Sequence, residues 1–462
     1  MNIMEQKSHE EIFSIFSEIS ESFRRENQYF DILYDSISFL TIKKTPSEET
    51  ISISNDKSGI VARTYTDKWK EFAVDNLSDI DLIKTHIPKI GEKSNKLSIR
   101  DGWTLNKELE VEINPKEIPL QQKIDKVRSI FGDIKKYDDR IINPIVVYAE
   151  LFTTRIFVNN EGCHLRQVIP RSRVFIQPVA KEDGTTDFDY YAPGGEIGFE
   201  IFKKVENNLN QIAQNSLDML KADKPPSGKY PIILDPDMAG LIAHESFGHG
   251  LEADQILRDR SYLKSLLDKK VASDISNIYD SPNISNEYGS YFFDDEGIKA
   301  QENLLVENGI LKNFIHNRFT ASQLNAEPKG NGRRESYAHP LIVRMTNTYF
   351  GSGDYDLDEM ISEIDKGVIL NRGYFGMEDP LGGGLQATSK KGYLIENGEK
   401  TKLLKAITLS GSVLKLLKNI DAISKDDLKL KPGTCGKGYE DFVPVTSGGS
   451  YIRVKDALIS PG

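Results

Sequence analysis

The stretch His244-Glu245-Ser246-Phe247-Gly248-His249 places a carboxylate beside the first of two histidines. Imidazole nitrogens bind Zn²⁺, and an adjacent glutamate can accept a proton from water at the metal. The common zinc motif has its histidines four residues apart, on one side of a helix. Here the spacing is five, which separates the side chains by about 140° on a regular helix. We therefore expect either an unrelated pair of histidines or a helix that widens into a π-turn or ends between them.

The residues before this stretch predict a strand followed by a helix. Residues 230–234 have the composition of a short buried strand, and Asp235-Pro236 supplies an N-cap and a proline at the first helical position. Residues then recur at helical intervals as far as the second histidine: Met238, Leu241, Ile242, Glu245 and His249. We therefore expect His244 to lie about two turns into a helix.

A metal site of this type needs a third protein ligand, and the chain has only seven histidines and two cysteines. Cys435 lies in a glycine-rich loop, residues 432–438, where a backbone can approach a metal closely and a thiolate can bind it. Cys163 follows a predicted hairpin turn, and a lone buried cysteine is usually an inert small apolar group. Cys435 is the better candidate, although residue type alone favours a non-ligand role for it too.

The sequence resembles the TldD/PmbA (TldE) peptidases. The matching stretches follow the family's order through the C-terminal half: 244–254, 294–297, 306–311, 330–339, 344–348, 387–398 and 435–437. The N-terminal half resembles the family only in its length and in the spacing of its predicted elements. The PmbA branch lacks the metal motif and this chain has it, so the resemblance is to the TldD side.

This resemblance implies a metallopeptidase that hydrolyses small unfolded proteins or peptides. Two motif histidines and a late cysteine hold the metal in the family, which implies that His244, His249 and Cys435 bind Zn²⁺. The motif glutamate is the catalytic base, a role implied here for Glu245. The family also works as a two-subunit assembly, either a heterodimer with a PmbA/TldE-like subunit or a homodimer.

The alternative is a non-catalytic protein that modulates a partner and has a structural metal site. A structural zinc site normally has four protein ligands, whereas a catalytic site has three and an open position. Because cysteine and histidine are scarce in this chain, a fourth ligand is hard to supply. The residues therefore favour catalysis.

Composition and charge limit the other classes of protein to which this chain could belong. The 462 residues are 38% hydrophobic and 28% charged, which is typical of a globular protein of two or three domains. The net charge of −11 argues against a nucleic-acid-binding surface. No apolar run reaches the roughly 18 residues that would indicate a membrane span. The first residues do not resemble a signal peptide and two cysteines suit a reducing compartment, so we expect a cytoplasmic location.

We expect an α+β protein with three domains. Residues 1–112 and 113–226 each predict an α+β unit, and residues 227–462 predict a β-rich catalytic domain with the metal-binding helix packed on it. The Pro/Gly linker Lys224-Pro225-Pro226-Ser227-Gly228 precedes that helix.

Turn signals refine this organisation. Predicted turns at 54–59 and 158–162 occupy matching places in the two N-terminal units, which indicates either a weak internal repeat or two ordinary α+β stretches. In the C-terminal region short strands such as 291–293 alternate with turns, among them the hairpin signals Asn308-Gly309 and Asn397-Gly398. The glycine-rich runs match no nucleotide-binding fingerprint.

Tyr337 and His339 belong to a donor-rich loop. They could stabilise an oxyanion or polarise a scissile carbonyl. A solvated loop with a structural Arg333–Glu335 ion pair is the simpler interpretation, and we prefer it.

Two groups of carboxylates are further candidates. Residues 294–296, Asp-Asp-Glu, could bind a peptide amino terminus or a second cation. Glu252 and Asp254 are better explained as partners that orient the ligating histidines through their other ring nitrogens. The β-rich domain is expected to bind an extended peptide by strand addition.

Overall fold

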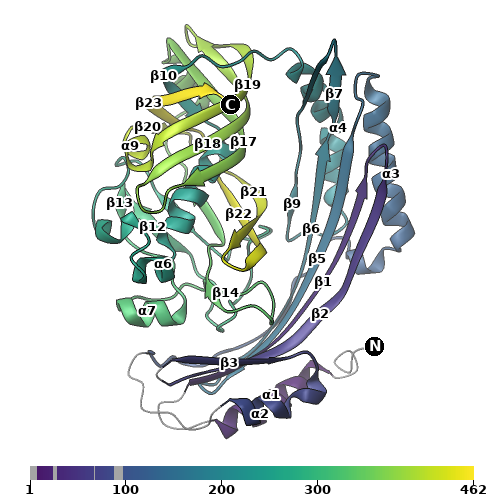
Figure 1. The fold of residues 1–462 in the computed structure, drawn as a ribbon, viewed down its shortest axis with the longest axis vertical. Helices are drawn as coiled ribbons and strands as arrows, with labels where there is room; N and C mark the ends of the chain where they lie inside the picture. The colour runs from purple at the N-terminus through teal and green to yellow at the C-terminus, as the bar shows by residue number, and fades with distance from the viewer. Residues whose placement is uncertain (1–7, 24–28, 67, 88–96) are drawn as a thin grey trace.

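One sheet spans the N-terminal half of the protein in the computed structural model, which describes residues 8–23, 29–66, 68–87 and 97–462. Its hydrogen-bonded order is β3 (Trp69–Val74), β2 (Glu49–Tyr65), β1 (Tyr29–Lys44), β5 (Ile145–Asn159), β6 (His164–Gln177) and β4 (Thr104–Glu108), with β9 (Gly194–Gly195) on β6. The strands are long and curve around the rest of the chain (Figure 1). Because β1 pairs antiparallel with β5, the two N-terminal units expected from the sequence share this sheet.

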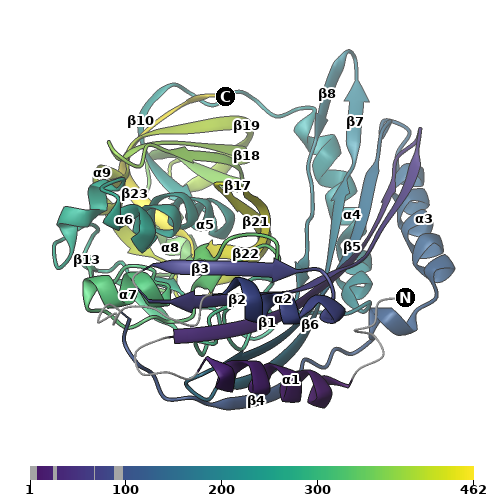
Figure 2. The same ribbon diagram turned by 60° about the horizontal axis from the view of Figure 1, so that its bottom comes forward.

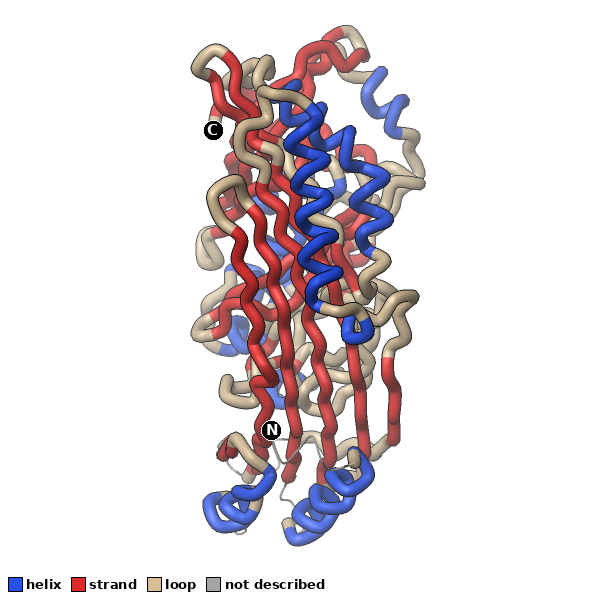
Figure 3. Tube along the Cα trace, turned by 90° about the vertical axis from the view of Figure 1, so that its right-hand side faces the viewer, coloured by secondary structure: helices blue, strands red, loops and turns tan. Residues whose placement is uncertain are grey.

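Helices cover the outer face of the sheet at its two ends (Figure 3). α3 (Leu120–Tyr137) and α4 (Ile201–Met219) lie at one end, beside the hairpin of β7 (Val179–Glu182) and β8 (Thr185–Phe188). α1 (His9–Ser22) and α2 (Asp81–His86) lie at the other end. α3 buries one stripe at helical spacing: Ile124, Val127, Ile130 and Ile134. Each end of the sheet therefore has its own apolar core.

The turn predicted at 54–59 is wrong. β2 runs through it, and the β1–β2 pairing shows only a register shift between Ile37 and Phe39. The hairpin turn lies at 45–48 instead, where the Thr45 N–H donates to the Glu48 carbonyl at 2.9 Å. Pairing with a long neighbouring strand outweighs the turn propensity of a polar segment. The predicted turn at 158–162 does join β5 to β6, so the proposed match between the two units is lost.

The C-terminal half contains two further large sheets. The first is β10 (Gly228–Leu234), β17 (Lys366–Glu378), β18 (Gly384–Glu396), β19 (Glu399–Ser412), β23 (Ile452–Pro461) and β20 (Ile420–Ile423). Because β10 pairs with both β17 and β23, this sheet closes on itself as a barrel. The second is β13 (Ile310–Leu311), β12 (Asn303–Glu307), β11 (Ile278–Asp280), β16 (Asn347–Phe350), β22 (Glu440–Gly449) and β21 (Lys429–Lys437).

A single apolar core joins these two sheets, and α5 (Pro236–Ala243) lies within it against β17 and β22. The remaining elements are α6 (Ala253–Leu257), α7 (Arg318–Leu324), α8 (Leu357–Ser362), α9 (Val413–Lys418), β14 (Gly332–Arg333) and β15 (Ile342–Val343). The expected α+β class with a β-rich C-terminal region is confirmed. Among the described residues no helix is both long and apolar enough to cross a membrane.

The strand predicted at 291–293 is wrong. These residues form a loop whose backbone is bound by a side chain of β6 rather than by a neighbouring strand. Gln167 accepts the Phe292 N–H at 2.9 Å and donates to the Phe293 carbonyl at 3.0 Å. The aromatic residues still point into apolar surroundings, so composition alone resembled a strand.

Buried ion pairs join the curved sheet to the C-terminal half, which lies on its inner side (Figure 1, Figure 2). Arg63 of β2 bonds Asp31 and lies 3.2 Å from Glu296. Arg155 of β5 lies 3.3 Å from Asp35 and 2.7 Å from Asp295. Each arginine therefore bonds one carboxylate of its own sheet and one of the opposite layer, which fixes the position of the layers.

We predict that Arg155→Met lowers the free energy of unfolding by about 3–5 kcal/mol, because it leaves two buried carboxylates without their cation. Denaturant unfolding measures this loss. The matched control is Arg128→Met, which removes an exposed ion pair with Glu49 and should change stability very little. Equal losses in the two variants would contradict the structural role of the interlayer pair.

Candidate metal centre

The helix leading to the motif begins where the sequence predicts. Asp235 caps α5 by accepting the Met238 N–H at 2.8 Å, and Pro236 holds the first helical position. α5 then packs closely on β22, since a Cβ on Gly240 would lie 2.3 Å from the Gly448 nitrogen. This close backbone contact fixes the point at which His244 leaves the helix.

The backbone widens into a π-turn over His244–Gly248. The His249 N–H donates to the His244 carbonyl, an i→i+5 bond, and this confirms the expected distortion. The extra residue in the turn brings both imidazoles to one side, with ring centroids 5.2 Å apart. Gly248 permits the turn to lie against Met345, because a Cβ would be 2.5 Å from its sulfur.

The third member of the cluster comes from β21. The Cys435 Sγ lies 3.2 Å from the His249 Nε2, and one donor atom from each of Cys435, His249 and His244 falls within 4.8 Å of the others. Cys435 sits at a register shift between β21 and β22, rather than in the free loop expected from its glycines. Tertiary structure thus assembles three donors, two of which are 186 residues apart.

The electrostatics of this cluster suit a divalent metal. Burial acts to raise the pKa of the Cys435 thiol, but hydrogen bonds with His244 and His249 outweigh it and lower the pKa to about 5. The sulfur is therefore a thiolate at neutral pH, which is the form that binds metal. Two imidazoles and one thiolate form a donor set that fits Zn²⁺.

Glu245 lies beside the cluster without belonging to it. Burial raises the pKa of its carboxyl. The charges of His244 and His249 lower this pKa, and the charge of Cys435 raises it. Gly376 of β17 provides the space for this side chain, because a Cβ there would lie 2.9 Å from the Glu245 Cγ. The carboxylate is thus held near the donors by an adjacent strand.

One of the two expected orienting carboxylates contacts a histidine. Glu252 lies 3.3 Å from the His249 Nδ1, which leaves the Nε2 for the cluster. Burial opposes ionisation of Glu252, but Lys437 and His249 lower its pKa to about 2. Asp254 does not orient a histidine; it accepts a hydrogen bond from the Lys437 Nζ at 2.8 Å. The interpretation of Asp254 as an orienting partner is therefore wrong.

Sequence reasoning missed Glu378 and Tyr262. Glu378 follows Gly376 by two residues on β17, so both occupy the face of the strand that adjoins the π-turn. Burial raises the pKa of Glu378 to about 8, and Tyr262 donates a hydrogen bond to it at 2.9 Å. Only the folding of β17 over the π-turn brings this carboxyl near Glu245, so no local motif could have identified it.

Tyr337 contacts the N-terminal half of the protein, whereas His339 contacts residues of its own loop. The Tyr337 hydroxyl donates to Asp75 at 2.8 Å and its N–H to Asp35 at 3.0 Å, both in the N-terminal half. His339 Nδ1 lies 2.8 Å from the Ser336 hydroxyl. Their proposed part in transition-state stabilisation stays a prediction.

The expected Arg333–Glu335 ion pair is wrong. Arg333 is buried and donates to the Met345 and Pro444 carbonyls. Glu335 instead accepts the backbone N–H groups of residues 441 and 442. Both side chains contact the backbone of β22, which pairs with the strand that carries Cys435. The loop therefore packs on that hairpin rather than extending into solvent.

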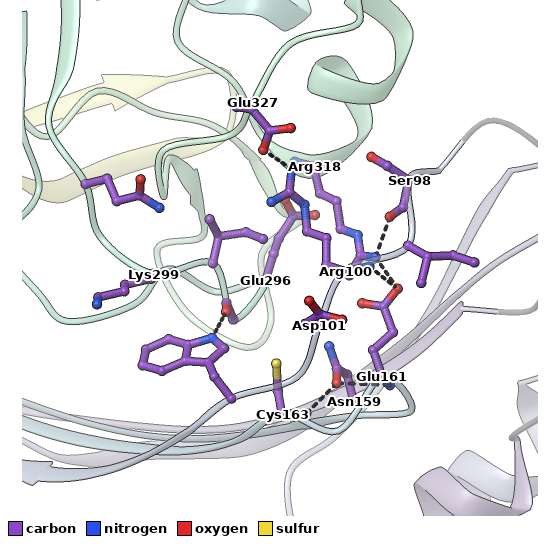
Figure 4. Close-up of a pocket in the computed structure, with 15 residues that line it drawn as sticks. Ser98, Arg100, Asp101, Asn159, Glu161, Cys163, Glu296, Lys299, Arg318 and Glu327 are labelled. Carbon is purple, nitrogen blue, oxygen red and sulfur yellow. Dashed lines mark hydrogen bonds and ion pairs between the residues drawn. The ribbon is translucent and has the colours of Figure 1, made fainter.

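The carboxylates 294–296 do not form an open site. Each is about 1% exposed and has internal partners, including backbone N–H groups for Asp294 and arginines for Asp295 and Glu296. Glu296 also lines a cavity of about 420 Å³, in which Arg318 bonds Glu161 (Figure 4). The expectation that this cluster binds a peptide terminus or cation is therefore wrong, since Asp294 is satisfied by its own backbone surroundings and Asp295 and Glu296 pair with arginines of the curved sheet.

Cys163 lines the same cavity, away from the metal cluster. Burial raises the pKa of its thiol, so the sulfur stays protonated at neutral pH. This agrees with the sequence-based interpretation of Cys163 as a small apolar group.

Comparison with known proteins identifies the family. The profile of the PmbA/TldA metallopeptidase C-terminal domain matches residues 227–461, and that of the central domain matches residues 113–220. The chain belongs to the TldD/PmbA metallopeptidase family. A metalloprotease of Methanocaldococcus jannaschii is 34% identical over 426 residues, which cover 90% of this chain and 92% of the relative. A zinc metalloprotease TldD homolog of Saccharolobus solfataricus is 29% identical, covering 92% and 95%.

Solved structures of distant relatives share the fold. A protein of Thermotoga maritima described as a candidate modulator of a DNA gyrase has a TM-score of 0.78 at 20% identity, covering 97% of this chain and all (100%) of that one. TldE from Thermococcus kodakarensis has a TM-score of 0.74 at 17% identity, covering 98% and 100%. At these identities the likeness concerns the fold alone.

We predict that Gly376→Ala lowers peptide hydrolysis roughly 10- to 100-fold while metal content is unchanged, because the side chains that the new Cβ meets first, Glu245 and Leu241 at 2.9 Å, are not donors of the cluster. Activity and metal analysis of the same preparation measure the two effects. Gly384→Ala is the matched control, since its Cβ would meet only the Asp379 Cβ at 3.9 Å. Full activity in Gly376→Ala would show that the position of Glu245 is not critical.

Proposed function

We propose that this protein is a zinc-dependent peptidase that cleaves small unfolded proteins or peptides, with His244, His249 and Cys435 as the zinc ligands. The observation that carries the proposal is the convergence of two imidazoles and a thiolate beside a separate carboxylate. In the described part of the chain no fourth histidine, cysteine or carboxylate joins this cluster. Three protein ligands are typical of a catalytic rather than a structural zinc site.

The residues of the chain divide the chemistry between them. A bound zinc ion supplies a Lewis acid that activates water and polarises a peptide carbonyl. Glu245 accepts the proton of the attacking water and returns it to the departing amine. Glu252 holds the His249 ring in the orientation that presents its Nε2.

The substrate is proposed to bind as an extended chain along β17. After Leu370 this strand leaves β10, and among the described pairings it keeps only β18 as a neighbour. Three large apolar side chains of this part are more than half exposed: Tyr374, Phe375 and Met377. A free strand edge offers backbone hydrogen bonds with loose sequence preference, and exposed apolar groups favour unfolded chains over folded ones.

The assembly and its location follow from the family resemblance and the chemistry. We propose a two-subunit assembly with a PmbA/TldE-like subunit, or with a second copy of this chain where no such subunit exists. A thiolate ligand and a second free cysteine suit a reducing compartment, in keeping with the cytoplasm.

A non-catalytic modulator with a structural metal is the second candidate, and the description of the Thermotoga maritima protein is what favours it. Tests of peptide hydrolysis by the chain, alone and with a PmbA-like subunit, separate the two functions. Absence of cleavage in both would favour the modulator.

We predict about one zinc ion per chain in the purified protein, with most of it lost in Cys435→Ala and in His249→Ala. A three-ligand site has no spare donor, so each loss is severe. Metal analysis by mass spectrometry measures the content, and Cys163→Ala is the matched control that should keep it. Full zinc in Cys435→Ala would remove Cys435 from the site.

We predict that Glu245→Gln keeps its zinc and still binds an unfolded peptide but cleaves it roughly 10²–10⁴-fold more slowly. The physical reason is the loss of the proton acceptor without loss of a ligand. Turnover rate, zinc content and peptide affinity are measured on one preparation. Undiminished cleavage would mean that a group other than Glu245 activates the water.

A further inference from the structure

The zinc donors sit on two separate segments that must meet before a metal can bind. His244 and His249 belong to the π-turn after α5, whereas Cys435 belongs to the β21–β22 hairpin, whose exposed turn includes Tyr439. Affinity for a metal is higher when its ligands are held in place in advance, because less conformational freedom is lost on binding. Some contact must therefore fix the hairpin to the π-turn segment.

Lys437 makes such a contact, two residues after the cysteine. Its Nζ lies 2.8 Å from the Asp254 Oδ1, 2.8 Å from the Val343 carbonyl and 3.1 Å from the Glu252 Oε2. Two of its N–H groups donate hydrogen bonds, to Asp254 and to the Val343 carbonyl, and the contact with Glu252 is an ion pair. The Lys437 side chain is only 11% exposed and Glu252 is 1% exposed, so water screens this bridge weakly.

The bridge reaches a zinc donor through one carboxylate. The Glu252 Oε2 that contacts the Lys437 Nζ is also the oxygen that lies 3.3 Å from the His249 Nδ1. An unbroken chain of contacts therefore runs from His249 through Glu252 to Lys437, and along two peptide units to Cys435. The same ammonium group is thus linked to the His249 ring through Glu252 and to Cys435 through the backbone of β21.

A second cation holds the cysteine itself. Arg344 is fully buried, donates to the Cys435 carbonyl at 2.5 Å and to Glu440 at 2.6 Å, and so spans the two strands of the hairpin. It acts where the β21–β22 ladder is interrupted by the register shift at Cys435. Arg344 fixes the hairpin internally, whereas Lys437 fixes it to the segment that carries His249.

We propose that Lys437 is a positioning residue for the metal centre: through Glu252 and Asp254 it fastens the Cys435 hairpin to the His249 segment and thereby sets the affinity for zinc. The inference rests on the proposed zinc function. It assigns no direct contact between Lys437 and the metal or the substrate.

The test is the zinc dissociation constant of the full-length chain, measured by competition with a chelator. We expect Lys437→Met to raise this constant about 10- to 100-fold, the range typical of residues that support metal ligands, and Lys437→Arg to recover part of the loss. The comparison variant is Lys431→Met, because Lys431 lies on the same strand and pairs at 2.7 Å with Asp237 in the first turn of α5, a contact that involves neither Glu252 nor a donor of the cluster. Its zinc affinity should stay within about two-fold of wild type.

Two further measurements separate positioning from a loss of fold. Thermal unfolding of the metal-free proteins should show a cooperative transition for both variants, at a lower temperature for Lys437→Met because Glu252 is left buried without its cation. Thiolate-to-metal absorption with Co²⁺ should weaken in Lys437→Met only. If Lys437→Met does not fold, Asp254→Asn removes one partner of the ammonium and should weaken zinc binding by a few-fold.

The outcomes are distinguishable. Wild-type zinc affinity in folded Lys437→Met, or equal losses in Lys437→Met and Lys431→Met, would overturn the positioning role while leaving the peptidase proposal intact. A wild-type chain that does not bind zinc would overturn the proposed function itself, and this inference with it.

Discussion

The hydrogen bond from the His249 N–H to the His244 carbonyl is the contact on which the centre depends. On a regular helix the five-residue spacing would direct the two imidazoles to different sides, about 140° apart. The π-turn removes that difference by adding one residue to a single turn. The packing of α5 against β22 and β17 then holds the widened turn in place. The π-turn and the close packing of α5 on the neighbouring strands therefore position the two histidines together.

Buried charges join segments of this protein that are far apart in the sequence. Arg63 and Arg155 connect the curved sheet to the C-terminal half, while Arg344 and Lys437 hold the Cys435 hairpin. Burying such groups lowers stability unless every charge is paired. Removing one partner of a buried pair lowers stability more than replacing both partners with apolar residues. Their value lies in direction, since a planar guanidinium bonds its partners in a fixed geometry, and an ammonium requires acceptors around it, which apolar contact does not impose. The donors of the cluster are thus positioned by charged contacts around them.

The sequence predicted the site better than its surroundings. The capped helix and the distorted spacing follow from residue type and interval, which are local properties, whereas the set of three donors was implied only by the family resemblance. The carboxylates 294–296, the Arg333–Glu335 pair and the role of Asp254 were misjudged, because each depends on which distant segment lies opposite. For the same reason Glu378 was missed, as nothing in its own neighbourhood in the chain indicates a partner.

The sequence by itself determined the α+β class, the helix start at Asp235, the need for a break between the two histidines and the membership of a family. These features rest on short-range periodicity, capping and motif order. Only the tertiary structure decided that one sheet unites the N-terminal units, that β2 runs through a polar segment that looks like a turn, and that Cys435 meets His249. Strand pairing and burial act between residues far apart in the chain, and their energies outweigh the local preferences that a sequence displays.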